Sequence, residues 1–342
     1  MTLARKHQIC LKSTPYYHIV NRCVRRAFLC GHDKLTGKDF SHRKQWLVDR
    51  IKYLGEIFSI RICAFAVLSN HYHLVLCVDT DMSESWTHEE ILLRYGKIHN
   101  TKNISALLKN ENNLTETERD EITKTVETWR QRLTDISWFE RCLNENIARA
   151  ANKEDETNGR FWHGRFKSQP LLDDAALITC MIYVDLNPIR AGVADSLETS
   201  DFTSIQARLR DHLKINSATL HDADPRKHNT RDDFLLPFLN ERRESATGTC
   251  LPIMYQHYYE LIDATGRGIK SGKRGWISEK SPSILDKLGI NSHKWLDSVS
   301  NYRSNFPSAI GAVDAIKKYI NSTGKRKWCV GISACSSLYP RL

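Results

Sequence analysis

The chain has 342 residues, of which 41% are hydrophobic and 26% charged. This composition is typical of a folded globular protein and excludes a disordered or low-complexity chain. Fifty Lys and Arg residues against forty Asp and Glu give a formal net charge of +10. A basic excess favours a polyphosphate or an anionic membrane surface as partner, but a basic surface without such a partner is an equally good interpretation.

The cysteines and the apolar runs indicate where in the cell the protein is located. Ten cysteines are present without a Cys-x-x-Cys pair, and those at 63, 77 and 180 fall in apolar segments that suit buried, reduced thiols. Residues 1–12 lack the apolar core of a signal peptide, and no run reaches the roughly 20 apolar residues of a membrane span. We therefore expect a cytoplasmic protein without disulfides or a membrane partner.

The first elements follow from residue periodicity. Residues 16–23 alternate and are rich in aromatic and β-branched side chains, which predicts a strand. Apolar residues at helical spacing predict a helix over 41–58. Residues 60–68 and 71–78 are apolar runs on either side of Ser69-Asn70, so we predict two strands joined by a short turn.

The middle of the chain is predicted to be helical. Residues 79–158 are polar, with one helix expected near 89–109 and another starting at Thr115, where Thr115 and Glu118 have the spacing of a capping box. We expect a break before Trp138 and a continuation to residue 151. Residues 160–172 are expected to be extended, and the next helix to begin at Asp173 or Asp174 and to end after Asn187, because Pro188 follows.

The order of these elements predicts the fold class. Strand, helix, strand, strand, helices and strand match the split β-α-β pattern of the α+β ferredoxin-like fold. We assign residues 1–213 to this domain, with 79–158 as a helical insertion. The polar residues 214–250 are interpreted as a linker, and 251–342 as a small, mainly helical, basic C-terminal domain with a flexible basic segment at 270–274.

Two imidazoles are the first chemical feature. Side chains alternate across a strand, so His71 and His73 are expected on one face and Tyr72 on the other. Two imidazoles on a rigid face can hold a divalent cation. The alternative is a pair of structural histidines, which is the better interpretation of an isolated His-x-His. The apolar strands on both sides favour the metal site, because polar rings are costly in a central sheet.

A tyrosine and an amide are the second feature. Tyr183 and Asn187 are four residues apart on the predicted helix and therefore one turn apart. They flank an apolar stripe of Leu177, Cys180, Met181 and Val184. Taken alone, this pattern is typical of a tyrosine at the edge of the core and an asparagine that ends the helix.

Considered together, these segments resemble the HUH single-tyrosine transposases, in particular the branch associated with repetitive extragenic palindromic (REP) elements. The resemblance covers roughly residues 10–200. It rests on three segments in the family's order, which are YYHIVNR at 16–22, AFAVLSNHYHLVL at 64–76, and residues 161–192 with Phe161-Trp162, RFKS at 165–168 and YVDLNP at 183–188.

The resemblance implies an activity and a set of roles. His71 and His73 match the metal ligands, Asn187 the position of a third ligand, and Tyr183 the catalytic tyrosine; the family's cofactor is Mg²⁺ or Mn²⁺. The implied reaction is cleavage of single-stranded or hairpin DNA through a 5′-phosphotyrosine link, followed by rejoining. One catalytic tyrosine per chain makes a homodimer possible, because a second cleavage needs another protomer or a reset of the first. The resemblance also implies a bacterial, nucleoid-associated protein.

Basic residues near these segments are candidates for DNA contact. Cations interleaved with aromatic rings suit a single strand, with phosphates on the charges and bases on the rings; an ordinary strand with solvated basic residues is an equally good interpretation. A weaker candidate is the loop after the first strand. The candidates are Arg22, Arg25, Arg26, Arg160, Trp162, His163, Arg165 and Lys167.

Two other functions remain open on the sequence. One is a domesticated protein that binds DNA hairpins without catalysis, and the other is a metal hydrolase that does not use Tyr183. No phosphate-binding loop of the P-loop kind and no Gly-x-Ser-x-Gly elbow is present in the sequence.

Overall fold

We analysed a computed structural model of the chain. It describes residues 8–24, 30–32, 37–101, 115–218, 234–241, 249–271, 281–323 and 331–339. None of the described helices combines the length and the apolarity needed to cross a membrane.

A four-stranded antiparallel sheet lies at the centre of the molecule. Its strands are β1 (Tyr16–Arg22), β2 (Ile60–Val67), β3 (His71–Val78) and β4 (Lys167–Leu171), in the spatial order β2-β3-β1-β4. Helix α1 (Arg43–Ile57) connects β1 to β2. This is the strand order of the ferredoxin-like fold, and the predicted α+β class is confirmed.

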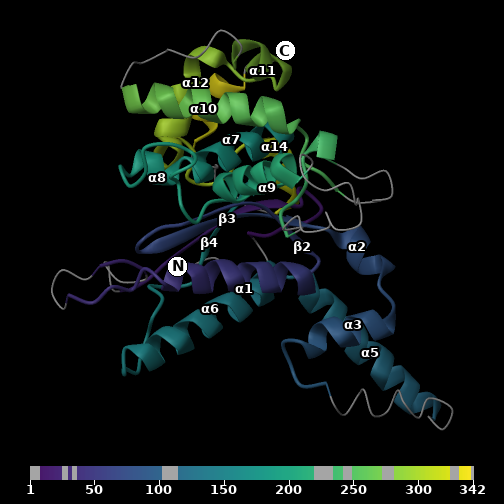
Figure 1. The fold of residues 1–342 in the computed structure, drawn as a ribbon. Helices are drawn as coiled ribbons and strands as arrows, with labels where there is room; N and C mark the ends of the chain where they lie inside the picture. Colours follow the sequence, from purple (N-terminus) through teal and green to yellow (C-terminus); the bar gives the residue numbers. More distant parts are fainter. Residues whose placement is uncertain are drawn as a thin grey trace.

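Helices cover both faces of this sheet (Figure 1). The Tyr72, Leu74 and Leu76 side chains of β3 belong to one core cluster together with α1 and α6 (Ile136–Glu154). The next residues along the strand, Val75 and Cys77, face the opposite way and pack in a second cluster with α7 (Asp174–Asp185). The period-two alternation of the strand thus separates two cores, one on each side of the sheet.

The described residues of the predicted insertion form four helices. They are α2 (Thr80–Ser85), α3 (His88–Gly96), α5 (Glu116–Leu133) and α6. The capping box at Thr115 and Glu118 is present. The break expected before Trp138 falls at 134–135, where the Asp135 carboxylate caps α6. Helix α3 ends at Gly96; of the helix expected to 109, residues 102–109 lie outside the described residues.

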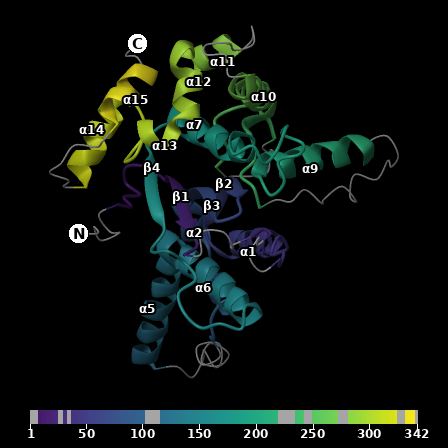
Figure 2. The same ribbon diagram turned by 90° about the vertical axis from the view of Figure 1, so that its left-hand side faces the viewer.

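These helices pack in two different ways. Helix α6 packs against α1 and completes the helical layer on that face of the sheet. Helices α3 and α5 pack on each other and extend away from the sheet, as both ribbon views show (Figures 1 and 2).

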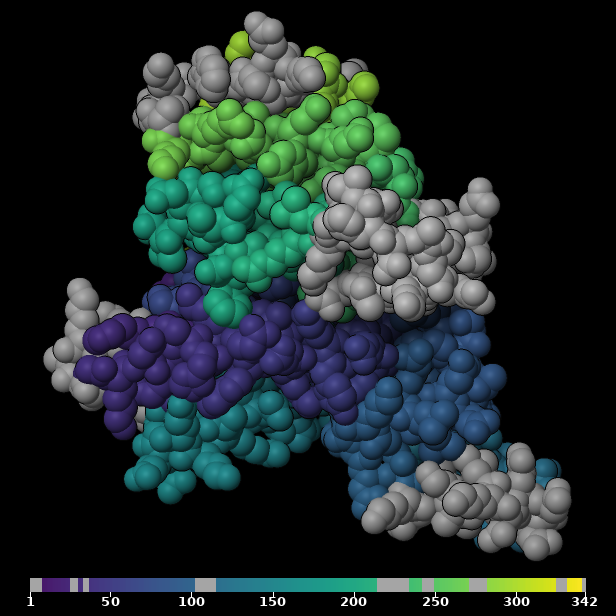
Figure 3. Space-filling view, viewed as in Figure 1, coloured from purple at the N-terminus to yellow at the C-terminus, as the bar shows by residue number. Residues whose placement is uncertain are grey.

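The C-terminal helices cover the other face and share its core. Residues from α7, α10, α12 and the last helices belong to a single hydrophobic cluster. In the space-filling view the teal and green residues of this layer lie directly against the purple N-terminal part of the chain (Figure 3). The described helices of this layer are α8 (Asn187–Arg190), α9 (Ser204–Ala218), η3 (Leu239–Glu241), α10 (Tyr255–Ser271), α11 (Ser281–Lys287), α12 (Ser292–Ser300), α13 (Tyr302–Asn305), α14 (Val313–Ser322) and α15 (Ile332–Leu338).

Part of the expected linker also belongs to the core. In the segment 234–241, Leu236 donates a backbone hydrogen bond to the Ile62 carbonyl at 2.8 Å, next to β2. Phe238 lies in the same cluster as α7. The described residues between 251 and 339 therefore share a core with the first part of the chain. Of the basic segment expected at 270–274, the structure describes Lys270 and Ser271 at the end of α10.

Helix α7 is buried on all sides. Asp173 caps it by accepting the Ala176 N–H at 2.8 Å, as the sequence predicts. Every residue from Ala175 to Asp185 is buried, so the core surrounds the whole helix and includes Tyr183 as well as the predicted apolar stripe. Pro188 does not stop the chain's helical course either, since it occupies the first turn of α8, where its missing N–H costs nothing.

Asp185 anchors the end of α7. Its carboxylate accepts hydrogen bonds from the Ser204 hydroxyl, from the Ile205 N–H at 3.0 Å and from the Tyr258 hydroxyl at 2.7 Å. These donors come from α9 and α10, so one side chain connects three helices. Burial raises the pKa of Asp185 to about 6, against an ordinary value of 3.8.

This shift predicts a pH-dependent effect of Asp185→Asn. Because the folded protein holds the proton more tightly than the unfolded chain, Asp185 favours folding fully below pH 3.8 and loses that contribution as the pH rises to 6. On going from pH 7 to pH 5 the wild type should gain about 1 kcal/mol of unfolding free energy over the variant. Urea unfolding of both proteins at the two pH values measures this; a difference that is independent of pH would contradict it.

Candidate active site

The two predicted imidazoles lie on one face of β3. His71 and His73 point toward α7, whereas Tyr72 points to the other face, where its hydroxyl donates to Glu140 Oε2 at 2.7 Å. The ring centroids of His71 and His73 are 5.0 Å apart. His73 is fully buried and His71 partly exposed, so the pair runs from the interior toward the end of the sheet.

Tyr183 lies beside this pair. Its ring meets the His73 ring edge-on, with centroids 5.6 Å apart. The helix that carries it packs on the strands because it is apolar all round, which places the phenol over β3. Two motifs that are far apart along the chain therefore converge on one side of the sheet.

A third imidazole, which the sequence analysis did not assign to the site, belongs to the same cluster. His18 of β1 stacks on His73 with a centroid distance of 5.1 Å and meets Tyr183 at 5.9 Å. Its Nε2 lies 2.9 Å from His73 Nδ1, and its Nδ1 lies 3.1 Å from Gln169 Oε1 of β4. The available signal was alternation along β1, but only the pairing of β1 with β3 brings the two rings together.

Asn187 lies close to the tyrosine. Its Nδ2 donates to the Tyr183 carbonyl at 3.1 Å across the junction of α7 and α8. The one-turn spacing therefore places the amide beside the backbone of Tyr183.

The donor set can be tested for a cation. Among the described residues no three His, Cys, Asp or Glu side chains converge as metal ligands. His18 uses both ring nitrogens in hydrogen bonds, so it is not a third ligand. His73 Nε2, however, is buried and has no hydrogen-bond partner within the described part of the chain. Two imidazoles and an amide fit a divalent transition metal such as Mn²⁺ better than Mg²⁺.

Burial keeps the three imidazoles neutral. It lowers the pKa of His18 to about 4, and together with the Arg22 and Arg303 charges it lowers the pKa of His71 to about 4. The pKa of His73 falls well below 6.5 for the same reason, with the neighbouring imidazoles adding to the effect. Neutral imidazole is the form that binds a metal.

Three residues that the sequence analysis did not identify surround Tyr183. Tyr302 of α13 stacks on it with centroids 4.2 Å apart, and the Arg190 guanidinium lies 4.7 Å above the Tyr183 ring. Burial raises the pKa of Tyr183, and the charges of Arg190 and Arg303 oppose that rise. Tyr302 and Arg303 come from the region expected to form a separate domain, so no local pattern pointed to them.

Most of the expected DNA contacts lie on the surface near this cluster. Arg22 is exposed and pairs with His71 across β1 and β3, and Lys167 is exposed opposite Val20. Arg160, His163 and Arg165 are also exposed, and the His163 N–H donates to the Arg22 carbonyl at 2.8 Å. Arg25 and Arg26 lie outside the described residues.

Trp162 departs from this expectation. Its side chain is only 9% exposed and packs in the core shared by β3, α1 and α6. The indole N–H donates to the Asn144 carbonyl at 2.9 Å, and the ring meets Tyr72 edge-on at 5.6 Å. Phe161 and Phe166 are buried in the same cluster, so the Phe and Trp rings of this segment point inward, whereas its basic residues and His163 face solvent.

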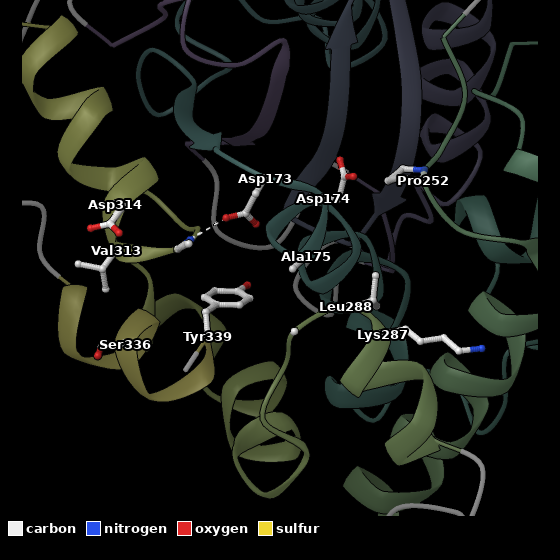
Figure 4. A pocket seen from close by; sticks show the side chains of 12 residues that line it. Asp173, Asp174, Ala175, Pro252, Lys287, Leu288, Val313, Asp314, Ser336 and Tyr339 are labelled. Atoms are coloured by element: carbon white, nitrogen blue, oxygen red, sulfur yellow. Dashed lines mark hydrogen bonds between the residues drawn. The ribbon is translucent and has the colours of Figure 1, made fainter. Parts of the chain in front are cut away.

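A cavity of about 750 Å³ lies away from this cluster, at the first turn of α7 (Figure 4). Asp173, Asp174 and Asp314 line it, and Asp173 accepts the Ala312 N–H at 2.6 Å. It contains none of the candidate residues named above. Its carboxylates would repel a phosphate backbone, which argues against DNA there.

Comparisons with known proteins give little further information. No family model and no curated protein matches the chain. One solved structure, described as a REP-associated tyrosine transposase bound to a REP hairpin, is similar to it with a TM-score of 0.37 and 13% sequence identity. The alignment covers 63% of this chain and 87% of that structure. A likeness this weak does not identify a function.

The position of Trp162 predicts a stability defect and no specific DNA defect. Trp162→Ala should lower the unfolding free energy by about 3–5 kcal/mol, because it leaves a cavity and removes the hydrogen bond to the Asn144 carbonyl. The exposed control Lys167→Ala should change it by less than about 0.5 kcal/mol. Urea unfolding measures both. If Trp162→Ala were as stable as the wild type but bound single-stranded DNA less tightly, the ring would have to contact bases.

Proposed function

We propose that this protein is a metal-dependent DNA strand transferase that cleaves single-stranded or hairpin DNA through a 5′-phosphotyrosine and rejoins it, as a tyrosine transposase does. The observation that supports it most is the contact between the Tyr183 and His73 rings, whose centroids are 5.6 Å apart. His73 Nε2, in the second of these rings, is a buried nitrogen without a partner among the described residues.

The reaction assigns a role to Tyr183. Its Oη loses its proton and forms a bond to the phosphorus of a phosphodiester, the bond from phosphorus to the 3′ oxygen breaks, and that oxygen takes up a proton and leaves as the 3′-hydroxyl. The phosphotyrosine keeps the energy of the broken bond, so the reverse step rejoins DNA without ATP. A divalent cation held by His71 and His73 would supply positive charge to a non-bridging phosphate oxygen.

The main obstacle to this reaction is the high pKa of the Tyr183 phenol, and the cations near it act against this. An ordinary tyrosine has a pKa of about 10, and burial raises the pKa of Tyr183 further. Arg190 and Arg303 stabilise the phenolate and so work against that rise. Exposed Arg22 and Lys167, near His71 and Val20 in the sheet, are placed to hold the phosphates on either side of the cleaved bond.

One observation favours a second function, the binding of DNA hairpins without catalysis. Tyr183 is only 1% exposed, and Tyr302 stacks directly on it. A phosphodiester reaches the phenol only after the residues that bury it move. A protein in which these residues never move would use the exposed basic residues for binding alone.

A covalent adduct distinguishes the two functions. Incubation with Mn²⁺ and single-stranded or hairpin oligonucleotides should yield a protein–DNA adduct that survives denaturing electrophoresis. Tyr183→Phe removes only the nucleophilic oxygen and should abolish the adduct, as should EDTA. Hairpin binding without an adduct in the wild type, retained in Tyr183→Phe and His71→Ala, would support the second function. Cleavage that persists in Tyr183→Phe would instead indicate a hydrolase.

The basic residues near the site predict the salt dependence of binding. Arg22→Ala and Lys167→Ala should each reduce the slope of log K against log salt concentration by about 0.7–0.9, because each removes one phosphate contact. The control Lys124→Ala removes an exposed cation from α5, which extends away from the sheet, and should leave the slope unchanged. Fluorescence anisotropy at several salt concentrations measures it; equal slopes in all three variants would place the DNA elsewhere.

A further inference from the structure

A row of hydrogen bonds runs from the C-terminal helices to His73. The Gln169 Nε2 donates to the backbone carbonyl of Phe306, at the end of α13. Gln169 Oε1 lies 3.1 Å from His18 Nδ1, and His18 Nε2 lies 2.9 Å from His73 Nδ1. The side chains in this row come from β4, β1 and β3, and β1 lies between the other two strands in the sheet.

The Phe306 carbonyl determines which atom donates and which accepts in each hydrogen bond of the row. A backbone carbonyl only accepts, so the Gln169 amide nitrogen must face Phe306 and the amide oxygen must face His18. The Tyr302 hydroxyl, 3.0 Å from the same oxygen, donates to it as well. Since the amide oxygen only accepts, the proton between Gln169 and His18 is on His18 Nδ1.

The protonated nitrogen of His18 in turn determines which nitrogen of His73 carries the proton. A neutral imidazole carries one proton, so a His18 ring protonated on Nδ1 accepts at Nε2. The proton in the 2.9 Å contact must therefore be on His73 Nδ1. That leaves a lone pair on His73 Nε2, the buried atom without a partner among the described residues.

The Nδ1–H form of His73 is not the tautomer that a neutral histidine prefers in water. A neutral histidine in water mostly carries its proton on Nε2, which would remove the lone pair that a metal needs. The neighbouring ring is held in the same way, because His71 Nδ1 lies 2.5 Å from Asn70 Oδ1, an acceptor. Both imidazoles therefore keep their Nε2 lone pairs.

We infer that His18 and Gln169 are positioning residues that hold His73 as the Nδ1–H tautomer and so prepare its Nε2 to bind a divalent transition metal. The inference rests on the proposed function, since it concerns the metal site proposed there. It gives His18 a role other than that of a ligand, and it makes the metal site depend on the backbone of the C-terminal region through Phe306.

The tautomer of His73 is the direct test. Long-range ¹H–¹⁵N spectra of the metal-free, ¹⁵N-histidine-labelled protein should show His73 protonated on Nδ1. His18→Phe removes the acceptor, so His73 should shift toward the Nε2–H form and the affinity for Mn²⁺, measured by calorimetry, should fall about ten- to hundredfold. His18→Gln offers an amide oxygen near the position of the lost Nε2 and should restore most of the affinity.

Matched variants separate this effect from misfolding and from failure of the proposed function. His293→Phe removes an exposed imidazole on α12 and should leave Mn²⁺ affinity unchanged. If His18→Phe does not fold, Gln169→Leu, which frees the His18 ring, should shift the His73 tautomer in the same direction. A wild-type His73 protonated on Nε2, or unchanged Mn²⁺ affinity in His18→Phe, overturns the inference. A wild type that binds no Mn²⁺ overturns the proposed metal site, while the spectrum still decides the tautomer.

Discussion

The burial of α7 between the sheet and the C-terminal helices is the constraint on which the candidate site depends. The helix is apolar around its whole circumference, so it is stable only when both of its sides are covered. The sheet covers one side, and α10, α12 and the last helices cover the other. Asp185 then fixes its end to α9 and α10. The position of Tyr183 over His73 is thus a consequence of core packing.

This packing sets the electrostatics of the site. The burial that holds Tyr183 in place also raises its pKa, and the burial that holds His73 keeps that ring neutral. The two effects have opposite value for catalysis, because a neutral imidazole binds a metal whereas a protonated phenol is a poor nucleophile. Arg190 and Arg303 offset the second effect. A buried site of this kind therefore needs cations close to the phenol, and both come from helices that follow α7 in the chain.

The sequence predicted the local features of this arrangement and missed the distant ones. Alternation along one strand is enough to place His71 and His73 on one face, and one-turn spacing is enough to place Asn187 at Tyr183. The part played by His18 depends on the register between β1 and β3, which no local pattern encodes. Tyr302 lies in a helix of four residues, too short to produce a periodicity. Trp162 was misplaced because alternating cations and rings occur both on surfaces that bind single strands and on segments with their rings in the core.

The C-terminal region is therefore part of the candidate site. The sequence suggested a separate basic domain, because the polar composition of 214–250 resembles a linker. In the structure this region supplies the ring that covers Tyr183, a cation near the phenol, and the carbonyl that orients Gln169. Tyr302, Arg303 and Phe306 lie in the four-residue helix α13 or directly after it, so one short segment of the C-terminal region both contacts Tyr183 and orients Gln169.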